Sequence, residues 1–388
     1  MVHFDCGALV KMGPTWSRHC EEWALIFGFP VNNSKRFDVD VLSTRIRQLL
    51  KLPDLQMEVL NVSHWELERT IASKYSEGRV FVAGDAAHKR SPTTGLGLNT
   101  AIEDACNLAW KLAFVLQGKA SSALLDTYAA ERRPVGLRNC DWALFTFSNF
   151  EVLQAAVGLL PGQREYNIKR FERIFEDSPQ GEAIRHHLQR VISTQDIEFS
   201  AHNIELGFVY ESRAVVSDGT RKPTEDCTGR SYVPTTRPGH RLPHAWIEKD
   251  QKVISTHDLI NLGQHDFVLI VDEAGDAWAD TARRISETSN VRIHVAGIRA
   301  RRHSNRQDFY NDHDNIWVKL REVGDGGAVL VRPDNFVVWR SFGPPVKTAD
   351  ELADAVRAVL GNPAVSGSET DKTKAVDRPS LANSHLDS

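Results

Sequence analysis

The sequence lacks three features that often assign a protein quickly: an excess of one charge, a long apolar run and a paired-cysteine motif. Its 388 residues carry 47 Lys+Arg against 51 Asp+Glu, a formal net charge of -4. This balance argues against a dedicated nucleic-acid-binding protein, which usually has a basic patch. No stretch approaches the roughly 18 uninterrupted apolar residues of a membrane span, and residues 1–6 lack the basic-then-apolar order of a secretion signal. We therefore expect a folded chain of two or three domains with no nucleic-acid partner and no membrane span.

The cysteines are scattered, with no C-x-x-C pair among them. They are Cys6, Cys20, Cys106, Cys140 and Cys227. An odd, widely spaced set is typical of reduced thiols in a reducing compartment, and it provides neither a disulfide framework nor a zinc site. His240 and His244 have a spacing that would suit a metal on a helix, but Pro243 between them argues against a helix there. We therefore expect a cytoplasmic protein without a bound metal.

Composition divides the chain into four parts. Residues 1–75 have the pattern of strands and connections, with an apolar strand starting at Trp23 and a helix over residues 39–50. Residues 76–204 contain the densest motif signal and then a mostly helical stretch that breaks at residues 160–162. Residues 205–362 alternate strands and helices as a separate α/β unit. Residues 363–388 are rich in Ser, Thr, Asp and Lys, and because they cannot bury enough apolar surface we expect a disordered tail.

A strand, an acidic residue and a glycine-rich loop follow one another between residues 79 and 97. Residues 79–83 are β-branched and aromatic enough to predict a buried strand. The strand ends at Gly84 and Asp85, and the carboxyl end of a strand is where open α/β sheets present ligand groups. The glycines of the following loop let its backbone turn tightly and approach a ligand closely. The pattern favours a ligand loop, with a purely structural turn as the alternative.

A helix is expected after this loop, capped by Asn99 or Thr100 and ended by Gly118. Its expected apolar face consists of Ala101, Ala105, Leu108, Leu112 and Val115. Such a helix N-terminus carries unpaired N–H groups and favours a bound anion. Residues 95–100 lack the third glycine of the phosphate-binding G-x-G-x-x-G pattern, and no P-loop motif occurs. The Asp85 carboxylate therefore suits a sugar hydroxyl better than a phosphate.

Several long motifs together resemble one enzyme family. They are residues 84–88 (GDAAH) with Pro92, residues 95–99 (GLGLN), residues 101–113 (AIEDACNLAWKLA), residues 128–134 (YAAERRP) and residues 235–246 (TTRPGHRLPHAW). This string closely resembles the single-component FAD-dependent aromatic hydroxylases, in particular the phenol hydroxylase and 2,4-dichlorophenol 6-monooxygenase group. The resemblance extends over nearly all of residues 7–345.

The resemblance implies the fold and the domain organisation. Residues 1–75 would be the remnant of a substrate domain, and residues 76–204 the C-terminal part of a glutathione-reductase-like FAD-binding domain with its following helices. Residues 205–362 would form a thioredoxin-like domain, structural or dimer-forming because C-x-x-C is absent. The family's N-terminal G-x-G-x-x-G segment has no counterpart here, so the FAD-binding domain is expected to be incomplete.

The same resemblance implies the cofactor site. Asp85 would bind the ribityl chain of FAD, Pro92 would lie near the reactive edge of the flavin, and the backbone from Gly95 to Asn99 would face the flavin N1/O2 edge. The complete set of implied FAD-binding residues is Gly84, Asp85, Pro92, Gly95, Leu96, Gly97, Leu98 and Asn99. The implied reaction uses NAD(P)H and O2 to hydroxylate a phenolic substrate ortho to its hydroxyl group. No catalytic residue is assigned by this match.

Other residues keep two interpretations. Phe27 and Trp65 are candidates for a phenol pocket, with core packing as the alternative, and His88 either approaches the flavin or stabilises the loop. Arg132 and Arg133 are interpreted as a helix-end cap. For the whole chain, the alternative to a working hydroxylase is a truncated, inactive homologue that acts as a binding or scaffold protein.

Overall fold

The computed structural model describes most of the chain and divides it into two compact units. The described residues are 2–4, 7–11, 23–27, 39–63, 66–160, 162–224, 226–261, 266–300, 308–345 and 350–361. The first unit covers residues 1–68 and the second covers residues 69–388. The expected disordered tail, residues 363–388, lies outside the described residues.

Among its described residues, the first unit contains a small antiparallel sheet and helix α1. The sheet has the order β1-β2-β3, with β1 at Val2–Phe4, β2 at Gly7–Lys11 and β3 at Trp23–Phe27. Helix α1, Val39–Leu50, buries Leu42 and Ile46, which are four residues apart and therefore lie on one helical face. Both the strand starting at Trp23 and the helix over residues 39–50 are confirmed.

The second unit begins with four two-residue strands. β4 is Thr70–Ile71, β5 is Ser76–Glu77, β6 is Val80–Phe81 and β7 is His88–Lys89. β4 pairs with β7 and β5 pairs with β6, both antiparallel. The prediction of a buried strand over residues 79–83 is therefore wrong: β6 is short, Val80 is 67% exposed, and among the described residues its partner is only β5. β-Propensity alone cannot bury a strand that has a single short neighbour.

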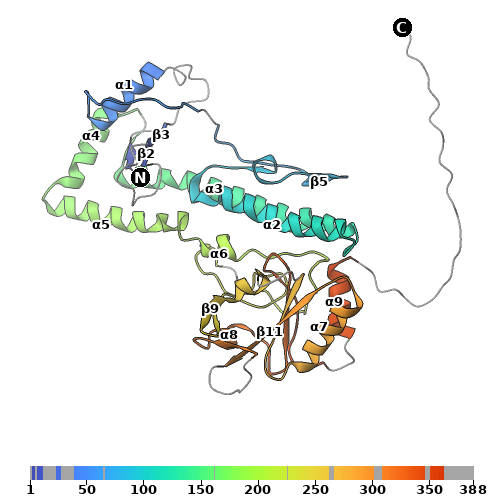
Figure 1. Cartoon of the computed structure of the whole chain (residues 1–388). Helices are drawn as coiled ribbons and strands as arrows, with labels where there is room; N and C mark the ends of the chain where they lie inside the picture. The colour runs from blue at the N-terminus through green and yellow to red at the C-terminus, as the bar shows by residue number, and fades with distance from the viewer. Residues whose placement is uncertain are drawn as a thin grey trace, which may run out of the picture. The chain divides into compact units, whose positions relative to one another are not determined.

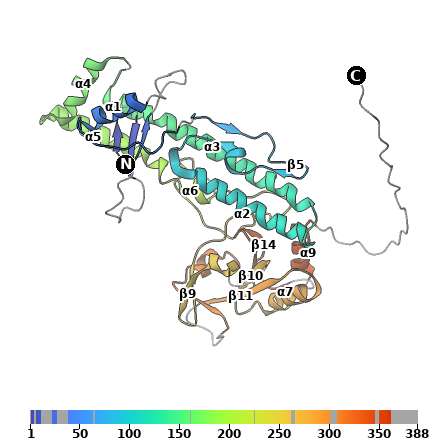
Figure 2. The same cartoon turned by 45° about the horizontal axis from the view of Figure 1, so that its top comes forward.

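Helices form the next part of this unit. α2 is Leu96–Leu116, α3 is Ala123–Val157, α4 is Arg164–Glu172, α5 is Pro179–Ser193 and α6 is His202–Leu206. Figures 1 and 2 show α2 and α3 running side by side. As predicted, α2 stops just before Gly118, which has a left-handed φ of 69°. The predicted break in the helical stretch falls between the end of α3 at Val157 and the start of α4 at Arg164. Within the described residues, no helix is both long and apolar enough to cross a membrane.

The buried face of α2 differs from the expected one. The buried residues are Leu96, Thr100, Asp104, Asn107, Trp110, Lys111 and Phe114. Of the expected apolar face, Ala105 is exposed and the other members are only half-buried. Hydropathy misassigned the face because the buried polar side chains find charged partners on α3, which removes the usual cost of burying them.

The C-terminal part of the second unit is a seven-stranded mixed sheet with the order β14-β13-β10-β11-β12-β8-β9. Its strands are β8 (Trp246–Lys249), β9 (Lys252–Ser255), β10 (Phe267–Val271), β11 (Ile293–Ala300), β12 (Tyr310–Asp312), β13 (Ala328–Val331) and β14 (Val337–Ser341). Its helices are α7 (Asp276–Thr288), α8 (Trp317–Leu320) and α9 (Asp350–Val359). Figure 1 shows α7 and α9 on the same side of the sheet.

The central strand β10 is covered on both faces. All five of its residues are buried. Phe267 and Leu269 pack into the cluster that contains Trp278 of α7, whereas Val268 and Ile270 pack into the cluster on the other face. A continuous apolar run is typical of such a doubly covered strand. The mixed α/β character expected for this part, and the hairpin of β13 and β14, are confirmed.

Candidate functional site

The residues from Gly84 to Asn99 form a tightly turned loop that leads into α2. A short 3-10 helix covers Gly84–Ala86 and a second covers Thr93–Gly95. Gly84 and Gly95 have left-handed φ values of 58° and 65°, and Thr94 between them in the chain also has a positive φ, 71°. A β-branched residue in this region is strained, and such strain is concentrated at ligand sites.

The expected cofactor residues divide into a supporting set and an exposed set. Gly84 and Leu96 are buried and Gly97 is half-buried. The exposed members are Asp85, Pro92, Gly95, Leu98 and Asn99. The loop therefore presents one acidic side chain and the first turn of a long helix on its outer surface.

The start of α2 differs from the prediction. Gly95, and not Asn99 or Thr100, occupies the N-cap position, and no side chain caps the helix. The Thr100 hydroxyl instead donates to the Leu96 carbonyl inside the first turn, at 2.8 Å. The N-terminal amides of α2 therefore keep their capacity to bind an acceptor that is not part of this turn.

These features fit the ribityl and flavin ring of FAD. A Cβ placed on Gly95 would meet nothing within 4 Å, so there is open space beside the helix start. The Asp85 carboxylate is exposed and accepts no hydrogen bond from the described residues. The Thr94 hydroxyl is buried without a hydrogen-bond partner among the described atoms. An open cradle, a free carboxylate and an unsatisfied hydroxyl are what a polar ligand at this loop would use.

A buried acidic residue, which the sequence analysis did not single out, hydrogen-bonds to the start of the loop. Asp104 of α2 is fully buried. It accepts hydrogen bonds from the Gly84 amide (3.1 Å) and from Arg132 Nε (2.7 Å), and its Oδ2 lies 2.8 Å from His88 Nε2. The sequence signal for this residue was its helical spacing: Thr100, Asp104 and Lys111 share the face of α2 that turns inward.

Charge holds Asp104 ionised. Burial by itself would raise the pKa of this carboxyl, but the hydrogen bond from His88 and the positive charge of Arg132 outweigh it, so the pKa lies below its usual value. Of the two interpretations of His88, the structure shows the loop-stabilising contact. Arg132 and Arg133 lie in the middle of α3, so their prediction as a helix-end cap is wrong. The helix continues through Pro134 because tertiary packing on both sides of it compensates for one missing backbone hydrogen bond.

A second buried cluster joins α2 and α3 to the turn between β13 and β14. Glu131 accepts from Arg332 (2.7 and 2.8 Å) and from Lys111 (2.7 Å), and Arg332 also contacts Asp334. Burial lowers the pKa of Lys111 to about 8. We call His88, Asp104 and Arg132 the supporting cluster. The charges around Glu131 lie beside this cluster because Glu131 and Arg132 are consecutive residues of α3.

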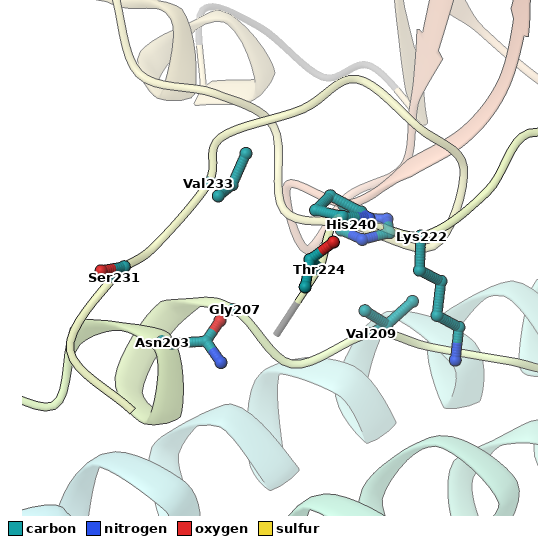
Figure 3. A pocket seen from close by; sticks show the side chains of 9 residues that line it. Asn203, Gly207, Val209, Lys222, Thr224, Ser231, Val233 and His240 are labelled. Carbon is teal, nitrogen blue, oxygen red and sulfur yellow. The ribbon is translucent and has the colours of Figure 1, made fainter. Parts of the chain in front are cut away.

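A small pocket outside the loop is shown in Figure 3. Its lining residues are Asn203, Gly207, Val209, Lys222, Pro223, Thr224, Ser231, Val233 and His240. No residue from Gly84 to Asn99 lines this pocket. Burial lowers the pKa of His240, and its Nδ1 lies 3.1 Å from the Arg237 carbonyl, which is a structural role.

The two expected substrate residues cannot be placed at the site. Trp65 and the side chain of Phe27 lie outside the described part of the chain. Both belong to the first unit, whereas the loop belongs to the second.

Two family models match the chain. The FAD binding domain matches residues 1–143, which include the whole loop, and the aromatic-ring hydroxylase C-terminal domain matches residues 235–363. The loop that the geometry singles out therefore lies in a segment with an independently recognised FAD-binding pattern.

Curated proteins and solved structures agree with these models. Phenol 2-monooxygenase from Pseudomonas sp. (strain EST1001) is 35% identical over 84% of this chain and 53% of its own length. The 2,4-dichlorophenol 6-monooxygenase from Cupriavidus pinatubonensis (strain JMP 134 / LMG 1197) is 33% identical over 92% of this chain and 59% of its own length. The chain thus spans little more than half the length of these relatives.

Among solved structures, the flavin-dependent monooxygenase PieE in complex with FAD and substrate has a TM-score of 0.78 and 36% identity, over 88% of this chain and 57% of that one. Aklavinone-11 hydroxylase, in a ternary complex with FAD and aklavinone, has a TM-score of 0.64 and 27% identity, over 87% and 54%. The two domain models and these relatives agree with one another: residues 1–143 match an FAD binding domain, residues 235–363 match the C-terminal domain of aromatic-ring hydroxylases, and most of the chain is similar to enzymes of that family.

Proposed function

We propose that this chain holds FAD at the loop from Gly84 to Asn99 and takes part in the hydroxylation of a phenolic substrate. The observation that carries the proposal is the exposed Asp85 carboxylate, which accepts no hydrogen bond from the described residues. It lies in the 3-10 helix Gly84–Ala86, which packs against the uncapped helix α2 inside the segment that matches an FAD-binding domain. The relatives' names, which include phenol and dichlorophenol monooxygenases, support the substrate class.

The chain's own residues would each do a separate part of the binding. Asp85 accepts hydrogen bonds from hydroxyl groups of the ribityl chain. The amides at the start of α2, from Leu96 onward, favour the negative charge that develops along one edge of the flavin ring. Pro92 and Leu98, both exposed, supply apolar contacts to the ring.

When bound, FAD supplies the redox and oxygen chemistry, with NAD(P)H as the electron donor and O2 as the oxygen source. We further propose ortho hydroxylation, a glutathione-reductase-like arrangement of the FAD domain and a thioredoxin-like C-terminal domain that serves dimerisation. The expected boundaries at residues 75, 204 and 362, the substrate contacts of Phe27 and Trp65, and the cytoplasmic location belong to the same proposal.

The first test is FAD uptake followed by visible absorption and by fluorescence titration. We expect the wild-type chain to take up FAD, and Asp85→Ala to weaken binding about tenfold to a hundredfold, because a hydrogen bond to a charged group is lost. The unfolding midpoint of the apo-protein should stay unchanged, because the Asp85 side chain is exposed and accepts no hydrogen bond from the described residues.

Asp314→Ala is the matched control, since Asp314 is also an exposed aspartate but lies in the C-terminal sheet region. It should leave FAD binding unchanged. A wild-type chain that takes up no FAD, or an Asp85→Ala variant that binds FAD as tightly as the wild type, would refute the proposed site.

A further inference from the structure

We propose that Arg132 is a positioning residue for the FAD loop, and that Tyr210, which packs with the C-terminal sheet, fixes Arg132 in place. The relevance of this relay to FAD rests on the function proposed above. Its consequence is that the C-terminal part of the chain sets the geometry of a cofactor loop more than a hundred residues earlier in the sequence.

Arg132 connects the two ends of the loop. Its Nε donates to Asp104, which in turn accepts from the Gly84 amide at the loop's start. Its Nη2 donates to the Thr100 carbonyl at 3.2 Å, in the first turns of α2 at the loop's end. One guanidinium therefore fixes the distance between the residue that precedes Asp85 and the helix start that would face the flavin.

Tyr210 orients the third side of this guanidinium. Arg132 Nη1 donates to the Tyr210 hydroxyl at 2.9 Å. The position of Tyr210 is set by the C-terminal sheet region, because its ring stacks on Phe336 with a centroid distance of 4.1 Å and its amide donates to the Gly239 carbonyl at 2.8 Å. Gly239 allows this approach: its φ is 89°, and a Cβ there would lie 2.4 Å from the Tyr210 carbonyl oxygen.

The chemistry of the relay requires arginine. Arg132 and Asp104 are fully buried, and Tyr210 is 2% exposed. The guanidinium meets the Asp104 carboxylate, the Thr100 carbonyl and the Tyr210 hydroxyl, and its Nη1 also lies 3.3 Å from Glu103 Oε2. Its donors form a rigid planar fork that reaches acceptors in different directions, whereas an ammonium on a flexible stem cannot reach all of them. Arg132→Lys therefore keeps the buried positive charge and removes the planar arrangement of hydrogen-bond donors.

The test compares Arg132→Lys and Tyr210→Phe with Arg340→Lys. Arg340 of β14 is also a buried arginine that is paired with acids, Asp218 and Glu322, but it makes no contact with the loop. Each variant is measured by hydrogen exchange of peptides covering residues 84–100 in the apo-protein, by fluorescence titration with FAD and by thermal unfolding.

We expect Arg132→Lys to raise the hydrogen-exchange rate of the loop peptides about tenfold and to raise the dissociation constant for FAD about tenfold, as for the loss of buried hydrogen bonds. Tyr210→Phe keeps the ring stacking and removes one acceptor, so a smaller change, about threefold, is expected in the same two measurements. Arg340→Lys should lower the unfolding midpoint and leave both loop measurements unchanged.

The proposal is overturned if Arg340→Lys and Arg132→Lys change loop exchange equally at matched loss of midpoint, because the role of Arg132 would then be general stability. If Arg132→Lys does not fold, Tyr210→Phe decides, and unchanged exchange in that variant rejects the relay. If the wild-type chain takes up no FAD, the proposed function fails, but hydrogen exchange in the apo-protein still decides whether the relay orders the loop.

Discussion

The two central strands β10 and β13 of the C-terminal sheet and helix α2 bury different kinds of residue. In these two strands, burial follows hydropathy: every residue of β10 and β13 is apolar and buried. In α2 the order is partly inverted, since Asp104, Asn107 and Lys111 are fully buried. At the same helix, Leu98 is 73% exposed and Leu116 is 81% exposed.

This difference separates two ways of holding a structure together. Apolar burial in the sheet is non-directional and stabilises the fold through area removed from water. The polar interior of α2 depends on direction, because each buried charge needs a partner at hydrogen-bonding distance or it becomes costly. The first kind of region tolerates exchange of one apolar residue for another, and the second positions individual atoms.

The largest expected effect comes from a substitution that removes the buried ion pairs between α2, α3 and Arg332. Glu131→Gln leaves Arg332 and Lys111 without their shared carboxylate in a fully buried site. We expect the free energy of unfolding to fall by about 4 kcal/mol, as for other broken buried ion pairs. Urea denaturation measures this change.

Asp126→Asn is the control for Glu131→Gln, because both residues lie in α3. Asp126 pairs with Arg213 at the surface, and we expect a change within about 0.5 kcal/mol. A loss for Glu131→Gln as small as that of Asp126→Asn would mean that the buried ion pairs of Glu131 with Lys111 and Arg332 are dispensable for stability.

The next effect compares one leucine from each region. Leu330 of β13 is fully buried in the core cluster with Leu269 and Trp278, so Leu330→Ala should cost about 3 kcal/mol through lost burial and a residual cavity. Leu98→Ala, at an exposed position, should change stability by no more than about 0.5 kcal/mol. Chemical denaturation of both variants measures the difference, and equal losses would contradict the inverted burial of α2.

The smallest expected effect is a pH dependence of stability that comes from the buried Lys111 of α2. Burial lowers the pKa of Lys111 to about 8 in the folded chain, against an ordinary value of 10.5. The unfolded chain therefore binds more protons between these values, and the folded state gains stability as the pH rises through them. Relative to Lys111→Met, wild type should gain about 2 kcal/mol between pH 7 and 9.5, measured by denaturation at each pH. Parallel stability curves for the two proteins would show that Lys111 does not titrate in this range.

Local sequence patterns predicted several elements correctly. The helix at Val39–Leu50, the strand at Phe267–Val271 and the end of α2 before Gly118 were all readable from hydropathy, β-propensity and glycine placement. Two predictions from such patterns were wrong: the buried strand over residues 79–83 and the helix-end cap at Arg132. Burial of a strand depends on its neighbouring strands, and the role of Arg132 depends on contacts with residues distant in the chain.

The supporting cluster shows the same limit at the site itself. The GDAAH and GLGLN motifs identified the loop by its glycines and its acid. Asp104 and Arg132 are 28 residues apart, and Glu131 and Arg332 are 201 residues apart. No periodicity links such pairs, so charged residues of α2 and α3 read as ordinary solvent-facing positions.

The sequence by itself determined the resemblance to aromatic-ring hydroxylases, the position of the loop and several of the helices and strands, because motif chemistry and hydrophobic periodicity are local properties of the chain. The tertiary structure alone decided which face of α2 is buried, which residue begins that helix and which charges are paired. The physical reason is that a buried charge is stable only beside its partner, and its partner is known only once distant segments have been brought together.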